Sequence, residues 1–178
     1  MLTPDGKEIT FNHDIDADYY DGGLCPFNAS KEPVSAPKPG YYWDYDYEEV
    51  RPGKWGYLDI QGNVIVEPQY VYAVGFYNGG GERAVVARLV DGELLWGAID
   101  RLGNEIVPCL YESLYTCWGD AFAYRRSGEE LYGIMDMDGN ILTPPQFAFF
   151  EAYDAAHSQH RLLKSIRIKN NPYQASPD

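Results

Sequence analysis

The most regular feature of the chain is a short pattern of apolar and polar positions that occurs three times. Each copy opens with an aromatic residue and a glycine. It continues with two apolar residues and an aspartate, then reaches a Gly-Asn pair after two variable positions. The copies begin at Trp55, Trp96 and Tyr132. Self-similarity with a period of about 40 residues indicates a fold built by stacking one small supersecondary unit.

Each copy of the pattern predicts a β-hairpin. The residues from the aromatic position to the aspartate form the first strand, and the glycine closes a tight turn because it readily adopts a positive φ. An apolar pair begins the returning strand, and the proline that follows is expected to end it because proline cannot donate to the ladder. The pairs and prolines are Ile65-Val66 with Pro68, Ile106-Val107 with Pro108, and Ile141-Leu142 with Pro144 and Pro145.

A third strand is expected at residues 84–88 and 121–125, where β-forming and small apolar residues are concentrated. A meander of about three strands cannot bury its apolar face without neighbours. The sequence therefore predicts an all-β fold of tandem antiparallel hairpin or meander repeats. About three such units would stack into one open or partly closed β-sheet domain with little helix.

The repeated aromatic and acidic positions have structural interpretations. A tryptophan side chain buries about 150–250 Å², so we expect Trp55 and Trp96 to pack in the core rather than to bind a ligand. The aspartates of the pattern are expected to fix the turn through side-chain to backbone hydrogen bonds. These aspartates are Asp59, Asp100 and Asp136.

The phrase from Lys54 to Tyr70, with Trp55-Gly56 at its start and Gly62-Asn63 in its turn, resembles the WG repeat. This repeat, also called KWG, occurs in many bacterial proteins. The resemblance covers about residues 53–150, with tyrosine replacing tryptophan in the third copy, and a degenerate earlier copy is suggested at residues 2–9. It implies an all-β scaffold without shared catalytic residues, so no active site is carried over and no enzymatic activity is expected.

The length of 178 residues suits one compact domain, within which three regions differ in character. Residues 1–52 form an acidic, aromatic-rich segment with a half-repeat and a proline-rich linker or irregular loop at residues 26–40, and this segment is expected to pack on the repeats. Residues 53–150 contain the repeats. Residues 151–178 are expected to form a C-terminal cap and a disordered tail.

The formal net charge of −13 narrows the choice of partners. Such a chain repels phosphate backbones, so nucleic acid is not expected as a partner, whereas a basic protein surface would be attracted. The sequence has no apolar run of the roughly 20 residues that a membrane-spanning helix needs, and no signal-peptide pattern. We therefore expect a cytoplasmic protein without a membrane partner, and the oligomeric state is left open.

The strongest candidate binding segment precedes the repeats. Its aromatic and acidic residues alternate with a period of two, which predicts a strand with one aromatic face and one acidic face. Aromatic anchors are enriched at interface hot spots, and flanking carboxylates would select a basic partner. The alternative interpretation is an ordinary strand that caps the first repeat. The residues are Tyr41, Tyr42, Trp43, Asp44, Tyr45, Asp46, Tyr47 and Glu48.

Metal and thiol chemistry receive weaker support. Asp14, Asp16 and Asp18 have the alternate spacing of Ca²⁺ ligands, but Tyr19 stands where an EF-hand has glycine, so a solvated acidic loop is the simpler interpretation. Cys25, Cys109 and Cys117 cannot all pair and are expected to be reduced structural thiols. No cofactor is expected.

Two function hypotheses follow from these observations. The first is a non-catalytic interaction module that presents an acidic, Tyr- and Trp-rich surface to a basic protein, of which an immunity or inhibitor protein is one concrete form. The second is a carbohydrate-binding domain or a small hydrolase that uses surface aromatics and Asp/Glu pairs.

Overall fold

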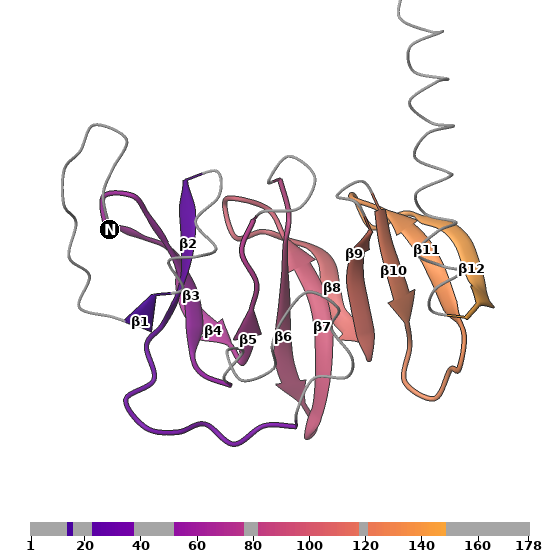
Figure 1. Ribbon diagram of the computed structural model, residues 1–178, viewed down its shortest axis with the longest axis horizontal. Coiled ribbons are helices and arrows are strands. Elements are labelled where there is room, and N and C mark those ends of the chain that lie inside the picture. The colour runs from indigo at the N-terminus through magenta and orange to yellow at the C-terminus, as the bar shows by residue number, and fades with distance from the viewer. Residues whose placement is uncertain (1–13, 16–22, 38–51, 77–81, 118–120, 149–178) are drawn as a thin grey trace, which may run out of the picture.

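The computed structural model describes residues 14–15, 23–37, 52–76, 82–117 and 121–148. Throughout these ranges the regular structure is β-strand, with no helix. The strands form three four-stranded antiparallel sheets that follow one another along the long axis of the molecule (Figure 1). The all-β, tandem-repeat prediction is thus confirmed.

Strand order within each sheet follows the chain. The first sheet contains β1 (Asp14–Ile15), β2 (Leu24–Asn28), β3 (Trp55–Asp59) and β4 (Val64–Tyr70). The second contains β5 (Tyr72–Ala73), β6 (Ala84–Val90), β7 (Glu93–Ile99) and β8 (Glu105–Tyr111). The third contains β9 (Ser113–Cys117), β10 (Ala121–Arg125), β11 (Tyr132–Asp136) and β12 (Ile141–Phe147).

The boundaries of the sheets do not coincide with the boundaries of the sequence repeat. The aromatic–Gly strand is the third strand of each sheet, and the returning strand is the fourth and lies at an edge. Single residues, Val71 and Glu112, then lead into the first strand of the next sheet. A sequence repeat therefore supplies the last two strands of one sheet and the first two of the next. The predicted unit of about three strands did not include β5 or β9.

The expectation that proline ends the returning strand is wrong. Pro68 lies inside β4, Pro108 inside β8, and Pro144 and Pro145 inside β12. Each of these strands is an edge strand whose pairing with the aromatic–Gly strand is interrupted by register shifts. Proline is tolerated at sheet edges and bulges because an N–H directed away from the ladder is not needed there.

The irregular returning strand explains why glycine follows the aromatic residue. A Cβ placed on Gly97 would collide with the carbonyl oxygen of Val107 and would lie 2.8 Å from the backbone nitrogen of Cys109. The backbone of Val66 approaches Gly56 in the same way. The glycine is therefore required by close approach of the neighbouring backbone.

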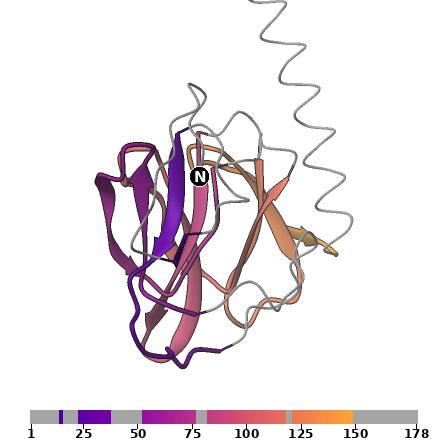
Figure 2. The ribbon, with the colours of Figure 1, turned by 60° about the vertical axis from the view of Figure 1, so that its left-hand side comes forward.

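Two apolar cores hold the three sheets together. Trp55, Tyr57 and Val66 pack with Val86 and Ile99 between the first and second sheets, and a second cluster lies between the second and third sheets. Members of the second cluster include Val85, Trp96, Val107, Tyr111, Leu114, Phe122, Tyr124 and Met135. In the turned view, the first sheet in violet and the third in orange lie on opposite sides of the molecule (Figure 2). Trp55 and Trp96 are core residues, as the sequence predicts.

The three Asp-x-x-Gly-Asn turns share one hydrogen-bond pattern. In the first turn, Asp59 Oδ1 accepts hydrogen bonds from the backbone N–H groups of Gln61 and Asn63 at 2.9 and 2.8 Å. Asp59 Oδ2 accepts another from Asn63 Nδ2 at 2.8 Å. Asp100 and Asp136 make the equivalent bonds in the other two turns, which confirms the predicted role of these aspartates.

Part of the segment that precedes the repeats belongs to the first sheet. Leu24–Asn28 forms β2 and pairs along its whole length with β3. Pro26 to Asn28 are therefore in a strand, although the sequence predicted a linker or irregular loop from residue 26. Residues 29–37 continue without a strand, and the predicted C-terminal cap and tail at 151–178 lie outside the described residues.

Candidate functional site

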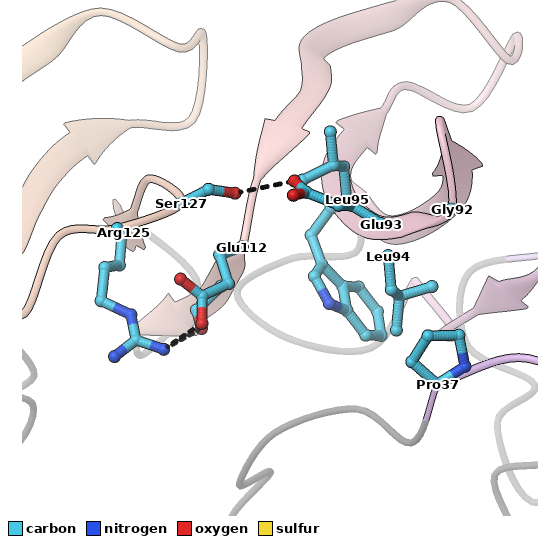
Figure 3. Close-up of a pocket in the computed structure, with 11 residues that line it drawn as sticks. Pro37, Gly92, Glu93, Leu94, Leu95, Glu112, Arg125 and Ser127 are labelled. Atoms are coloured by element: carbon cyan, nitrogen blue, oxygen red, sulfur yellow. Dashed lines mark hydrogen bonds and ion pairs between the residues drawn. The ribbon is translucent and has the colours of Figure 1, made fainter.

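A cavity of about 590 Å³ lies at the ends of strands from the second and third sheets (Figure 3). Its polar wall contains Glu93, Glu112, Ser113, Arg125 and Ser127. These residues come from different elements, because the β6–β7 turn, the crossing between sheets and the β10–β11 turn meet here.

The position of Glu93 follows from the turn that precedes it. Asp91 and Gly92 join β6 to β7 with φ angles of 52° and 86°. Two successive positive φ values are typical of a tight hairpin turn, and Gly supplies one of them without steric cost. Glu93 is the first residue of β7 and is exposed. Ser127 Oγ donates a hydrogen bond to its Oε2 atom at 3.3 Å.

Arg125 is held in place by three neighbours. Its Nη2 atom donates to Glu112 Oε1 at 2.9 Å and lies 3.5 Å from Ser113 Oγ. Its guanidinium carbon lies 5.2 Å from the centre of the Tyr132 ring, within the range of a cation–π contact. Ser113 is almost fully buried, with 4% of its surface exposed. The guanidinium is thus engaged by the protein itself.

The charges of the cavity wall are two carboxylates and one guanidinium. Figure 3 shows the Arg125–Glu112 ion pair on one side and the Ser127–Glu93 hydrogen bond on the other. Because one carboxylate is neutralised by Arg125, the wall carries an excess of negative charge. The remaining lining is apolar and includes Pro37, Leu94, Leu95 and Trp96. The arrangement suits a ligand that combines a cation with an aliphatic part.

The cysteines are buried away from this cavity and are free thiols, in agreement with the sequence interpretation. Burial raises the pKa of Cys109 and the pKa of Cys117 to about 12 in each case. A thiol is nucleophilic only as its thiolate. These side chains therefore act as small apolar core groups at neutral pH.

The arginines of the described ranges are all paired with carboxylates. The pairs are Arg83–Asp138, Arg88–Glu105, Arg101–Glu82, Arg125–Glu112 and Arg126–Glu129. Several of them also join elements far apart in sequence, as Arg83 Nε does by donating to the carbonyl oxygen of Met137 at 2.9 Å. The described arginines are thus engaged by carboxylates of the protein itself.

The predicted binding segment is not part of the described structure. The described residues do not include Tyr41, Tyr42, Trp43, Asp44, Tyr45, Asp46, Tyr47 and Glu48. In sequence they follow Pro37, which lines the cavity.

The Ca²⁺ hypothesis concerns residues of which little is described. Asp14 belongs to β1, so it is in a strand rather than in the expected acidic loop, while Asp16 and Asp18 lie outside the described residues. Within the described ranges, no group of three or more His, Cys, Asp or Glu side chains is arranged to hold a metal ion.

Sequence reasoning did not identify the cavity. Glu93, Glu112 and Arg125 are separated along the chain and carry no motif. The only signal available was positional. Glu93 follows an Asp-Gly turn, and Glu112 stands between two aromatic stretches, where the chain changes sheet.

The comparisons with known proteins agree with the fold. A family model described as "WG containing repeat" matches residues 55–87, 96–116 and 132–154. Neither a curated protein nor a solved structure matches the chain. In the part of the chain that the structure describes, no helix has the length and apolar character to cross a membrane.

Proposed function

Because residues 55–154 belong to the WG-repeat family, we propose that this chain is a non-catalytic interaction module whose acidic surface binds a basic protein partner. The repeats supply a rigid support built from three stacked sheets. On this proposal the stack has a structural role, and recognition belongs to side chains that the stack displays.

The observation that carries the proposal is the distribution of charge. Every described arginine is paired with a carboxylate. In contrast, Glu67, Asp91 and Glu130 are exposed and have no ion pair with another described residue. The remaining field is therefore negative, as expected from a net charge of −13. Such a field accelerates encounter with a basic surface and disfavours nucleic acid.

One concrete form of this function is an immunity or inhibitor protein that masks a basic toxin. Size and charge support it, since a small acidic domain can cover a basic surface and associate rapidly with it. A cytoplasmic location is part of this proposal.

The test is affinity capture with the full chain immobilised. We expect a partner with a basic isoelectric point that is retained at ~50 mM salt and released at ~500 mM, because salt shortens the range of surface electrostatics. A chain with Glu67→Gln, Asp91→Asn and Glu130→Gln should retain less of the same partner. Capture that is indifferent to salt and to these substitutions would contradict the proposal.

The cavity supports a second candidate, a carbohydrate-binding domain or a small hydrolase. Its wall contains two carboxylic acids, Glu93 and Glu112, the residue type that sugar-cleaving sites use. Retention on a polysaccharide column in the absence of a protein partner would favour this function. Loss of that retention in Glu93→Gln, with an unchanged melting temperature, would assign it to the cavity.

A further inference from the structure

The charged groups of the cavity differ in how many of their hydrogen-bonding positions are already occupied by other residues of the protein. Arg125 directs its guanidinium at Glu112, Ser113 and the ring of Tyr132. Its side chain is 26% exposed. The Nη2 atom is already bonded to Glu112, and the two carboxylates of the wall outnumber this single cation. The site is therefore poorly suited to an anionic ligand.

The two carboxylates, in contrast to Arg125, can still accept hydrogen bonds from a ligand. Glu93 accepts a hydrogen bond from Ser127 Oγ at one of its two oxygens, and no described residue forms an ion pair with it. Glu112 shares its charge with Arg125 through Oε1 and is 44% exposed. An ionised carboxylate has about four lone-pair sites. Both groups can accept further hydrogen bonds from an ammonium or a guanidinium.

The rest of the lining can accommodate a hydrocarbon chain. Leu94 extends toward Pro37 (Figure 3), and both line the cavity together with the largely buried Leu95 and Trp96. Lysine and arginine side chains combine an aliphatic stem with a charged end, so they can cover apolar surface while the charge is paired elsewhere. The volume of about 590 Å³ lies in the range of ligand pockets.

We infer that this cavity receives a lysine or arginine side chain of the basic protein partner, with Glu93 and Glu112 binding its charge and Leu94 and Pro37 its stem. This inference rests on the proposed function and assigns it a specific contact. The site would then set the register of the partner, while the surrounding acidity governs the rate of association.

The experiment measures binding of a fluorescent hexalysine peptide to the full chain by anisotropy. Glu93→Gln removes one cavity carboxylate that is not part of a described ion pair. Glu67→Gln makes the same change of charge on the exposed edge strand β4 and is the matched control. We expect about tenfold weaker binding in Glu93→Gln, typical of a lost charge-assisted hydrogen bond, and less than about twofold in the control.

Each alternative outcome has a defined meaning. Equal weakening in the two variants, with unchanged melting temperatures, would overturn the cavity as the site and leave the interaction proposal standing. Free spermidine that binds as tightly as the peptide would overturn the assignment to a protein side chain. Absence of peptide binding at low salt would overturn the inference, whereas the proposed function fails only if the capture experiment finds no salt-sensitive basic partner.

Discussion

Gly103, in the turn of the second repeat, lies against the side chain of Val66 on β4 of the first sheet. A Cβ on Gly103 would come within 2.8 Å of Val66 Cγ2. Gly139, in the turn of the third repeat, lies against Val107 on β8 in the same way, with a Cβ distance of 3.3 Å to Cγ2. The turns of the second and third repeats are thus packed on the returning strand of the repeat before them.

This contact predicts energetic coupling between neighbouring repeats. Gly103→Ala should destabilise the protein by about 2–3 kcal/mol, since alanine is disfavoured at positive φ and its methyl group would collide with Val66. The effect should be smaller when Val66 is also alanine, with a coupling of about 1 kcal/mol. Urea unfolding of the single and double variants measures this coupling.

Gly139→Ala is the control for backbone strain, since Gly103 and Gly139 have the same φ of 82°. The losses of stability caused by Gly139→Ala and Val66→Ala should add in the double variant, because Gly139 contacts Val107 and not Val66. Additivity in the Gly103 cycle as well would show that the turn of the second repeat is not packed on Val66 as described.

The glycine after the aromatic residue gives a second prediction. Gly97→Ala would place a methyl group against the backbone of Val107 and Cys109, which cannot move aside as a side chain could. We expect a loss of about 3 kcal/mol or more in the free energy of unfolding. Gly128→Ala, where a Cβ would meet open space at a φ of 79°, should lose only about 1 kcal/mol. Similar losses in calorimetric melts of the two variants would contradict this account.

The aspartate turns predict a dependence of stability on acid. Burial opposes ionisation of Asp100, but hydrogen bonds from the Asn104 side chain and from the backbone of Asn104 and Leu102, with the charge of Arg83, hold its pKa below the ordinary value of 3.8. Below that value the unfolded chain binds more protons than the folded chain. The stabilisation is therefore complete above about pH 4 and is lost as the pH falls through the folded-state pKa.

Asp100→Asn should lower stability at pH 7 by about 1 kcal/mol through the lost turn bonds. It should also flatten the decline of stability below pH 4. Chemical unfolding at a series of pH values provides the measurement, with Glu67→Gln as the control for a change in net charge alone. An acid decline in Asp100→Asn as steep as in wild type would count against the proposed role of the turn.

The buried thiols predict resistance to alkylation. With pKa values of about 12, Cys109 and Cys117 would be ionised in only about one molecule in ten thousand at pH 8. We expect iodoacetamide to label these two residues far more slowly in the native chain than in urea, as followed by mass spectrometry of peptides. Rapid native labelling of either cysteine would show that its surroundings open readily.

The repeat phrase contains enough local information to predict its own structure. Trp55 and Trp96 recur with the strand pattern around them, and Asp59 stands at the distance from Gly62 and Asn63 that the turn requires. These features depend on residues close in sequence, so the strand and the turn can be predicted from the sequence alone. The buried thiols and the all-β class follow for the same reason.

The errors concern relations between segments that are distant in sequence. Pro68 can lie inside β4 because β4 is an edge strand that pairs on one side only. The sequence does not show that β4 lies at an edge, whereas the sheet order does. The sequence predicts a linker or irregular loop from Pro26, but Pro26 to Asn28 belong to β2, a strand that is recognisable only by its pairing with β3. The cavity combines Glu93, Glu112 and Arg125, which come from three separate parts of the chain, so no local sequence pattern predicts it.

Each sequence repeat begins in the middle of one sheet and ends in the middle of the next, and this offset affects how such a protein could arise by duplication. A duplicated segment adds one whole sheet wherever its boundaries fall, because the half-sheets at its two ends complete each other. The first repeat, however, needs a partner from outside the repeated region, and β2 provides it by pairing with β3. A gene fragment beginning at Trp55 would encode three repeats yet only two complete sheets.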